Sequence, residues 1–306
     1  MFNVTKISFF LIFTTTIQCL DDCNKNYFKN AITSYGKRKG YDEYRIFLEE
    51  EISTVYSMKV TGENIKHLCR NEIPEAILKA DLQNIGLSYI EVNFLQNTTL
   101  RMLNLSFNSI FKVRNNVFSD SKLVLLDLSH NIVEILEGKA FENMPFLEGI
   151  ILDYNRISKW DSNWFKNTNL HLVSLKNNII AELPRNATQN LKGHTDKYLY
   201  ILLLKIYLDN NRIKYIHPEA FTNLNKMGII SLTYNKLFEL SSKTFESVYS
   251  IGYMDVSHNN FICFSSQSLT TFNNVRTLVI ANNRLNDECR KQMMRFFENK
   301  MDVIIF

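Results

Sequence analysis

The chain has 306 residues, a formal net charge of +4 and 45% hydrophobic residues. Because 35 basic residues nearly balance 31 acidic ones, the composition gives no strong indication of nucleic-acid binding. Nine glycines and four prolines are too few for a collagen-like or low-complexity chain, so we expect a folded protein with a large core.

Residues 1–20 have the features of a signal peptide. Lys6 supplies the positive charge, and residues 7–17 form an apolar stretch that is too short to span a bilayer. A transmembrane anchor is the competing interpretation. No later segment is long and apolar enough to span, so we predict a secreted, extracellular mature chain.

The cysteines fit an oxidising compartment. If Cys19 leaves with the signal peptide, four remain, two near each end of the chain: Cys23, Cys69, Cys263 and Cys289. An even number predicts disulfide bonds, and four cysteines allow three pairings. Their positions favour Cys23–Cys69 and Cys263–Cys289. There is no CxxC or histidine-flanked pair, so we predict no metal site, and no motif indicates a cofactor.

A single pattern recurs between residues 55 and 285. One copy has apolar residues at positions 1, 4, 6 and 11 and asparagine at position 9: Leu123, Leu126, Leu128, Asn131 and Val133. Eight copies share the asparagine: Asn108, Asn131, Asn155, Asn178, Asn211, Asn235, Asn259 and Asn283. Two earlier copies, starting at Val55 and Ile77, have Glu63 and Ile85 in its place. Five copies also carry a phenylalanine eighteen residues after their start: Phe118, Phe141, Phe165, Phe221 and Phe245.

Alternation of apolar and polar residues around position 5 is typical of a strand with one buried face. The pattern resembles the extracellular leucine-rich-repeat family, including Toll-receptor ectodomains, connectin- and chaoptin-type adhesion proteins and insect leucine-rich immune proteins. The resemblance implies an α/β solenoid, or horseshoe, with a parallel concave β-sheet of about ten repeats over residues 55–285. It also implies that the asparagines form a buried ladder that hydrogen-bonds the adjoining turn.

The segments outside the repeats are expected to cover the ends of the solenoid. We predict an N-terminal cap over residues 21–54 and a C-terminal cap over residues 286–306. In the latter, Cys289, Met293, Phe296 and Phe297 have the spacing of an amphipathic helix; a partner-binding helix is the alternative. One repeat is longer, with extra residues within 191–202. These predict a bulged loop, with a ligand-contacting loop or an error in the gene model as alternatives.

In such a solenoid the residue before the ladder asparagine lines one edge of the concave face, and the residue at position 5 points from its centre. Phe107, His130 and Tyr154 form one row of aromatic edge residues, and Tyr234 and His258 form another. Rows of exposed aromatics favour a protein-binding surface. The predicted partner-binding residues are Phe107, His130, Ile151, Tyr154, Tyr207, Tyr234, Asp255 and His258. The alternative is that the aromatics only shield strand edges.

An enzyme is not expected. Asp127, Ser129 and His130 stand together, as do Asp255, Ser257 and His258, but each set lies at one short strand end rather than in the arrangement of a catalytic triad. Serine also occupies this slot without a histidine at Ser106. We predict no catalytic residues. Three glycosylation sequons, at Asn97, Asn104 and Asn186, fit a secreted glycoprotein.

We therefore predict a secreted recognition or scaffold protein that binds a protein partner on its concave face, with innate immunity as the expected setting. A cell-adhesion or matrix protein, and a regulatory subunit or inhibitor of an extracellular enzyme, are the alternatives. We expect no nucleic-acid partner and no membrane span in the mature chain. Homo- or hetero-oligomerisation is left open.

Overall fold

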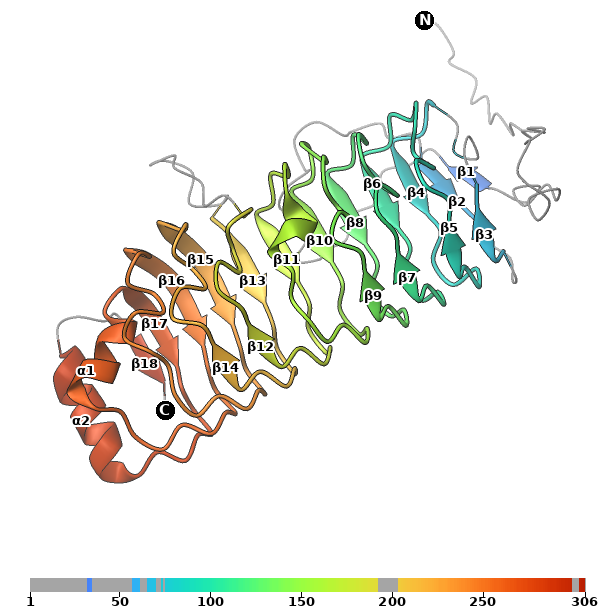
Figure 1. Ribbon diagram of the computed structural model, residues 1–306. Coiled ribbons are helices and arrows are strands. Elements are labelled where there is room, and N and C mark those ends of the chain that lie inside the picture. Colours follow the sequence, from blue (N-terminus) through green and yellow to red (C-terminus); the bar gives the residue numbers. More distant parts are fainter. Residues whose placement is uncertain are drawn as a thin grey trace, which may run out of the picture.

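The computed structural model describes residues 32–34, 57–60, 65–69, 73, 75–191, 203–298 and 303–305. These residues form an elongated solenoid whose strands lie side by side from the N-terminal to the C-terminal end (Figure 1). The predicted signal peptide, most of the predicted N-terminal cap and residues 192–202 of the long repeat lie outside the described residues. No helix among the described residues is long and apolar enough to cross a membrane.

A twelve-stranded sheet runs along the whole solenoid. Each of the ten predicted repeats contributes one parallel strand, including the two that lack the asparagine: β2 Ser57–Lys59, β4 Lys79–Asp81, β6 Met102–Asn104, β8 Leu125–Asp127, β10 Gly149–Ile151, β11 Leu172–Ser174, β13 Lys205–Tyr207, β15 Lys226–Ser231, β16 Ser250–Asp255 and β17 Val275–Val279. The sheet ends with β1 (Ile32–Ser34), antiparallel to β2, and β18 (Val303–Ile305), parallel to β17. The predicted parallel solenoid is therefore confirmed.

The strands pair without stagger. Leu103 of β6 lies opposite Leu126 of β8, which lies opposite Ile150 of β10. Equivalent positions of successive repeats therefore form straight rows along the molecule. Short parallel pairs follow one border of the sheet (Figure 1): β3 His67–Leu68 with β5 Tyr89–Ile90, β7 Lys112–Val113 with β9 Ile135–Leu136, and β12 Glu182–Leu183 with β14 Tyr215–Ile216.

The core is built from two of these rows and a column of rings. The apolar residues at positions 4 and 6 are buried in every described repeat. Phe118, Phe141 and Phe165 stack behind the sheet with centroids 6.1 and 6.2 Å apart, and Phe94 extends this column by a ring 6.3 Å from Phe118. Phe221 and Phe245 form a second stack at 4.8 Å. All five predicted phenylalanines are thus buried.

The asparagine ladder forms as expected. Asn155 lies with Nδ2 3.0 Å from the carbonyl oxygen of Leu128 in the preceding turn and 3.1 Å from that of Leu152 in its own turn. Its Oδ1 accepts a hydrogen bond of 2.9 Å from the backbone N–H of Val133. Each side chain therefore satisfies buried backbone groups of two turns at once, which explains why asparagine recurs at this position.

The C-terminal end is covered by helices. α1 (Ser266–Leu269) and the 3-10 turn η4 (Thr270–Phe272) precede α2 (Asp287–Phe297), which is the amphipathic helix expected within residues 287–300. Another 3-10 turn, η2, spans Ser162–Phe165. Asn286 caps α2 by accepting a hydrogen bond from the backbone N–H of Cys289, and Met293 and Phe297 are buried.

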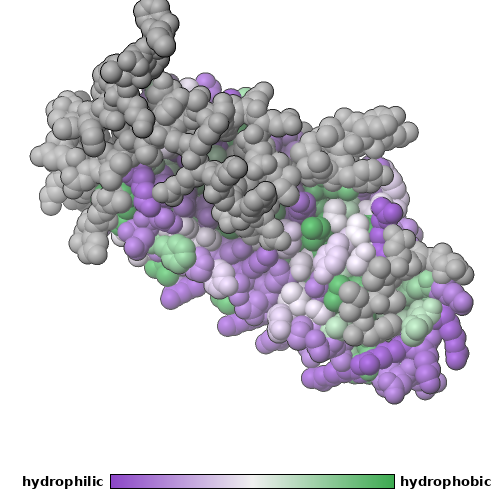
Figure 2. Space-filling model, turned by 180° about the vertical axis from the view of Figure 1, so that it is seen from behind, coloured by the Kyte–Doolittle hydropathy of each residue, from purple (hydrophilic) through white to green (hydrophobic). Residues whose placement is uncertain are grey.

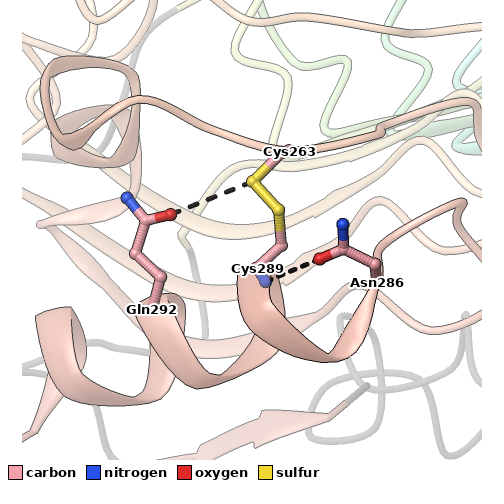
Figure 3. The surroundings of a disulfide bond; sticks show 4 residues. All are labelled: Cys263, Asn286, Cys289 and Gln292. Carbon is pink, nitrogen blue, oxygen red and sulfur yellow. Dashed lines mark hydrogen bonds between the residues drawn. A yellow bond between two sulfur atoms is a disulfide. The ribbon is translucent and has the colours of Figure 1, made fainter.

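A disulfide bond ties this end together. Cys289 of α2 is bonded to Cys263 in the ninth repeat, with Gln292 beside it (Figure 3). This is the pairing favoured from the sequence. At the other end, Cys69 is buried and disulfide-bonded, whereas Cys23 lies outside the described residues.

Candidate binding edge and concave face

The residues that precede the ladder asparagines share a left-handed backbone. In all nine described repeats that contain this position, φ lies between 52° and 55°: Asn84, Phe107, His130, Tyr154, Asn177, Asn210, Tyr234, His258 and Asn282. We call this set the edge row. Gly62, in the first repeat, lies outside the described residues. The turn is fixed by hydrogen bonds between repeats; for example, the N–H of Tyr154 donates to the carbonyl of Lys176 at 2.9 Å.

Asparagine, and to a lesser degree histidine, is enriched in this conformation, whereas phenylalanine and tyrosine rarely adopt it. A left-handed backbone costs a residue with a bulky side chain roughly 1–2 kcal/mol. Four repeats use asparagine, whereas five place an aromatic ring at the same point. The aromatic residues are therefore not what the turn itself requires. Backbone strain of this kind is a reason to look for a function.

The aromatic side chains of the N-terminal half stack in one pile. His130 lies between Phe107 and Tyr154, with centroids 4.1 and 4.2 Å apart and ring planes within 8° and 11° of parallel. Phe107 and Tyr154 remain 53% and 50% exposed. The pile thus presents ring edges to solvent while its internal faces are covered. The sequence predicted the row but not the stacking.

A second pile stands in the C-terminal half. Tyr234 and His258 stack at 3.9 Å and 12°, and Nε2 of His258 lies 3.0 Å from Nδ2 of Asn282. Tyr234 is 55% exposed. Between the two piles, Asn210 donates a side-chain hydrogen bond to Asn177. The edge row is therefore continuous, with an amide pair separating two aromatic piles.

The predicted residues in the centre of the concave face differ in exposure. Ile151 is only 6% exposed and offers little surface to a partner. Tyr207 is half-buried, and Nζ of Lys176 lies 4.3 Å from the centre of its ring. Asp255 accepts hydrogen bonds from both the N–H and Oγ of Ser257, at 2.9 and 2.6 Å. The structure therefore brings the predicted aromatic residues of the edge row together but does not join Ile151 to them as an exposed contact.

The two Asp-Ser-His sets have no triad geometry. Oγ of Ser257 donates a hydrogen bond directly to the carboxylate of Asp255, while the imidazole of His258 faces Asn282. Likewise, Asp127 accepts a hydrogen bond from the backbone N–H of Ser129, and the ring of His130 is stacked between those of Phe107 and Tyr154. A triad needs the histidine between serine and carboxylate. Among the described residues no group of three or more His, Cys, Asp or Glu side chains could hold a metal ion.

Two carboxylates on the concave face, Asp153, which is buried, and Asp209, which is half-buried, were not predicted. Burial raises the pKa of Asp153, against the hydrogen bonds that its Oδ1 accepts from Oγ of Ser174 at 2.6 Å and the N–H of Lys176 at 2.8 Å. Burial likewise raises the pKa of Asp209, which lies 3.9 Å from Nζ of Lys176 and accepts from Ser231. The one feature of the sequence that could have indicated them is that each aspartate stands two residues after position 5 of its repeat.

Exposed apolar residues continue the edge row outward. Beyond Phe107 and His130 lie Phe111, Ile132 and Ile135, each more than a third exposed. They belong to neighbouring turns, because the N–H of Ile132 donates to the carbonyl of Ile110. In the view from behind, paler and hydrophobic residues gather among hydrophilic ones toward the C-terminal end (Figure 2). Sequence reasoning missed these residues because it considered only the concave positions.

The three sequons lie in different surroundings. Asn97 is exposed and Asn186 is half-buried, and both sit in turns with positive φ. The side chain of Asn104 is engaged on the concave face: Oδ1 accepts from the N–H and Oγ of Ser106, and Nδ2 donates to Asp81. Glycosylation of all three stays a prediction.

These features define a leucine-rich-repeat solenoid with a row of aromatic side chains along one edge of its concave face. A family model described as "Leucine rich repeat" matches residues 98–157, 201–261 and 228–285, and the chain belongs to this family. Mouse (Mus musculus) podocan is 35% identical over 75 residues, which is 24% of this chain and 12% of podocan.

Three solved complexes contain chains with a similar fold. The mouse RP105/MD-1 complex matches with a TM-score of 0.67 and 20% identity, over 81% of this chain and 41% of that chain. The TLR13–ssRNA13 complex matches with a TM-score of 0.62 and 19% identity, over 78% of this chain and 34% of that chain. The Drosophila Toll–Spatzle complex matches with a TM-score of 0.51 and 20% identity, over 69% of this chain and 31% of that chain. The matches extend over less than half of each of these longer chains, and at this level of identity they show the fold alone.

Proposed function

We propose that this protein is a secreted recognition or scaffold protein that binds a protein partner along the edge row and the adjoining concave face. The observation that carries the proposal is the presence of five aromatic side chains in a left-handed position that asparagine fills in the other repeats. The phenylalanine and the two tyrosines among them are strained in the backbone, and their side chains are about half exposed. Binding to a partner supplies a reason for both.

The composition of the edge supports a protein partner. Tyrosine and phenylalanine are enriched in protein interfaces because they bury a large area at a small loss of side-chain entropy. The piles also fix each ring before binding, so little rotamer freedom remains to be lost. The fold is compatible with this role, since the RP105 and Toll neighbours are described as complexes with MD-1 and Spatzle. Innate immunity is the setting that we propose on that analogy of fold.

The test is affinity capture with the tagged full chain from native extracellular fluid, followed by identification of what co-purifies. The variant combines Tyr154→Asn, Tyr207→Ala and Tyr234→Asn. Asparagine at the two edge positions retains the residue that other repeats use, so the fold is preserved. The matched control combines Tyr215→Ala and Tyr249→Ala, two exposed tyrosines outside the edge row.

We expect one dominant protein, captured by the wild-type and control chains and lost from the variant. Capture by all three alike would contradict the assignment of the site. Recovery of the chain alone, with binding to intact cells, would instead support the adhesion function.

A further inference from the structure

We infer that the edge of repeats seven to ten is a docking surface for an acidic segment of a partner protein that also carries apolar side chains. This inference rests on the proposed function and specifies the chemistry of the partner. The surface comprises three positions in each of four repeats, which we call the basic edge: Asn210, Arg212, Lys214, Tyr234, Lys236, Phe238, His258, Asn260, Ile262, Asn282, Arg284 and Asn286.

The backbone places these twelve side chains on one side. In each repeat the chain alternates between an outward residue and a buried one: Asn211 and Ile213, for example, are buried between Asn210, Arg212 and Lys214, which are exposed. Backbone hydrogen bonds join successive turns at equivalent positions. The N–H of Lys236 donates to the carbonyl of Ile213 at 2.8 Å, and that of Asn260 to Leu237 at 2.7 Å. The twelve residues therefore form a regular grid.

The grid carries four positive charges and no negative one. Arg212, Lys214, Lys236 and Arg284 are exposed, and within the described part of the chain none of them forms an ion pair. Some other cations of the solenoid do form ion pairs. Arg156 lies 3.2 Å from Glu134, and Arg185 lies 2.6 Å from Glu219. Three acidic residues stand next to grid residues in the sequence: Asp209, whose carboxylate lies 3.9 Å from Nζ of Lys176, and Glu239 and Asp287.

An unpaired row of cations attracts carboxylates. Each exposed pair contributes little by itself, but complementary charge also steers association and selects the partner. Arginine at two of the four positions allows bidentate binding of a carboxylate. The spacing between the cations follows the repeats, so an extended segment lying along the solenoid meets them one after another.

The same grid contains large exposed apolar side chains. Tyr234, Phe238 and Ile262 are 55%, 54% and 61% exposed. Tyr234 and Phe238 stand on either side of Lys236 in repeat eight, and Ile262 takes the position equivalent to Phe238 in repeat nine. A partner that buries them needs apolar side chains of its own, which a polypeptide supplies and a sulfated glycan does not.

A nucleic acid fits less well. Base binding to single strands depends on open aromatic faces on which bases stack. Here Tyr234 and His258 stack on each other at 3.9 Å, so the facing sides of both rings are covered. Ile262 offers a base no ring on which to stack, and Phe238 is the one exposed ring of the grid outside this pile. The geometry points to an acidic polypeptide.

The experiment measures binding of fluorescent polymers to the full secreted chain at low and high salt by anisotropy. The probes are a random glutamate–tyrosine copolymer, polyglutamate, a heparin-derived oligosaccharide and single-stranded oligouridine. The variant combines Arg212→Glu, Lys236→Glu and Arg284→Glu. The matched control combines Lys122→Glu, Lys159→Glu and Lys243→Glu, which reverses the same number of exposed charges outside the basic edge. Circular dichroism verifies that both variants are folded.

We expect the copolymer to bind more tightly than the other three probes. Its affinity should fall at least about tenfold in the variant and in high salt, and remain nearly unchanged in the control. Equal loss in the control, no loss in the variant, no binding of the copolymer, or tighter binding of oligouridine or heparin would each overturn the inference.

The two proposals fail separately. If the tyrosine variant loses a captured partner but the charge-reversed variant keeps it, the proposed function stands and the acidic-segment inference fails. If the copolymer binds through the basic edge but native fluid yields no partner and no cell binding, the surface exists and the proposed function fails.

Discussion

Two rows of side chains run the length of this solenoid one residue apart, and they obey different rules. In the ladder, eight repeats have asparagine, because the side chain must donate to and accept from buried backbone groups of two turns. In the edge row next to it, the backbone demands only a positive φ, and the residue varies among asparagine, phenylalanine, histidine and tyrosine. The fold therefore requires asparagine in the ladder. In the edge row the fold permits several residue types, and we propose that the aromatic ones are there to bind a partner.

The largest expected effect is on the ladder. Asn155→Ala removes the partners of a buried N–H and buried carbonyls, and each unsatisfied group costs about 1–3 kcal/mol. We expect the free energy of unfolding to fall by about 3 kcal/mol in urea titrations. The control is Asn177→Gly in the edge row, where glycine adopts the left-handed backbone freely. A loss of similar size there would erase the distinction between the rows.

The next effect is on binding. His130→Asn removes the middle ring of the N-terminal pile, which both neighbours contact. We expect the affinity for the captured partner to fall about tenfold, or about 1.4 kcal/mol, measured by biolayer interferometry. Phe146→Ala serves as the control, because this exposed ring lies before β10 rather than after it. Unchanged affinity in His130→Asn would show that the pile only shields the strand edge.

A reciprocal exchange within the edge row tests the backbone argument. Tyr154→Asn relieves strain but loses one ring contact worth about 0.5–1.5 kcal/mol, so stability should change by less than about 1 kcal/mol. Asn177→Tyr adds the strain and should lower stability by about 1 kcal/mol. Thermal unfolding compares the two. If both exchanges had effects of the same sign and size, residue choice in this row would not depend on the left-handed backbone.

The smallest effect concerns pH. Because burial raises the pKa of Asp153 in the folded state, its ionised form opposes folding at neutral pH. That penalty disappears as the pH falls through the raised pKa toward about 3.9, the ordinary value. Wild type should therefore gain stability relative to Asp153→Asn between pH 7 and pH 4. A constant difference in unfolding free energy over this range would contradict the assignment.

The sequence predicted most of the fold because each repeat position is dictated locally. Position 9 needs an amide, positions 4 and 6 need apolar side chains, and these requirements located all ten strands. Phe94 was missed because it stands one residue earlier in its repeat than the other core phenylalanines.

The site was predicted only in part. Aligning the repeats was enough to predict the rows of aromatic residues. It did not predict the positive φ, because asparagine stands at this position in some repeats and tyrosine in others, and the two residue types differ in their preference for this conformation. Ring stacking and the burial of Ile151 depend on contacts between turns, which no single repeat encodes. The basic edge was missed because cations at position 10 are visible as a set only when the turns are aligned in space.

The most direct test of the edge row is hydroxyl-radical footprinting of the chain with and without its co-purified partner, since radicals oxidise exposed aromatic side chains. The account predicts that the partner protects Phe107, Tyr154 and Tyr234 while Phe146 and Tyr249, which precede their strands, are oxidised as before. Protection of Phe146 and Tyr249 with the edge row still oxidised would contradict it.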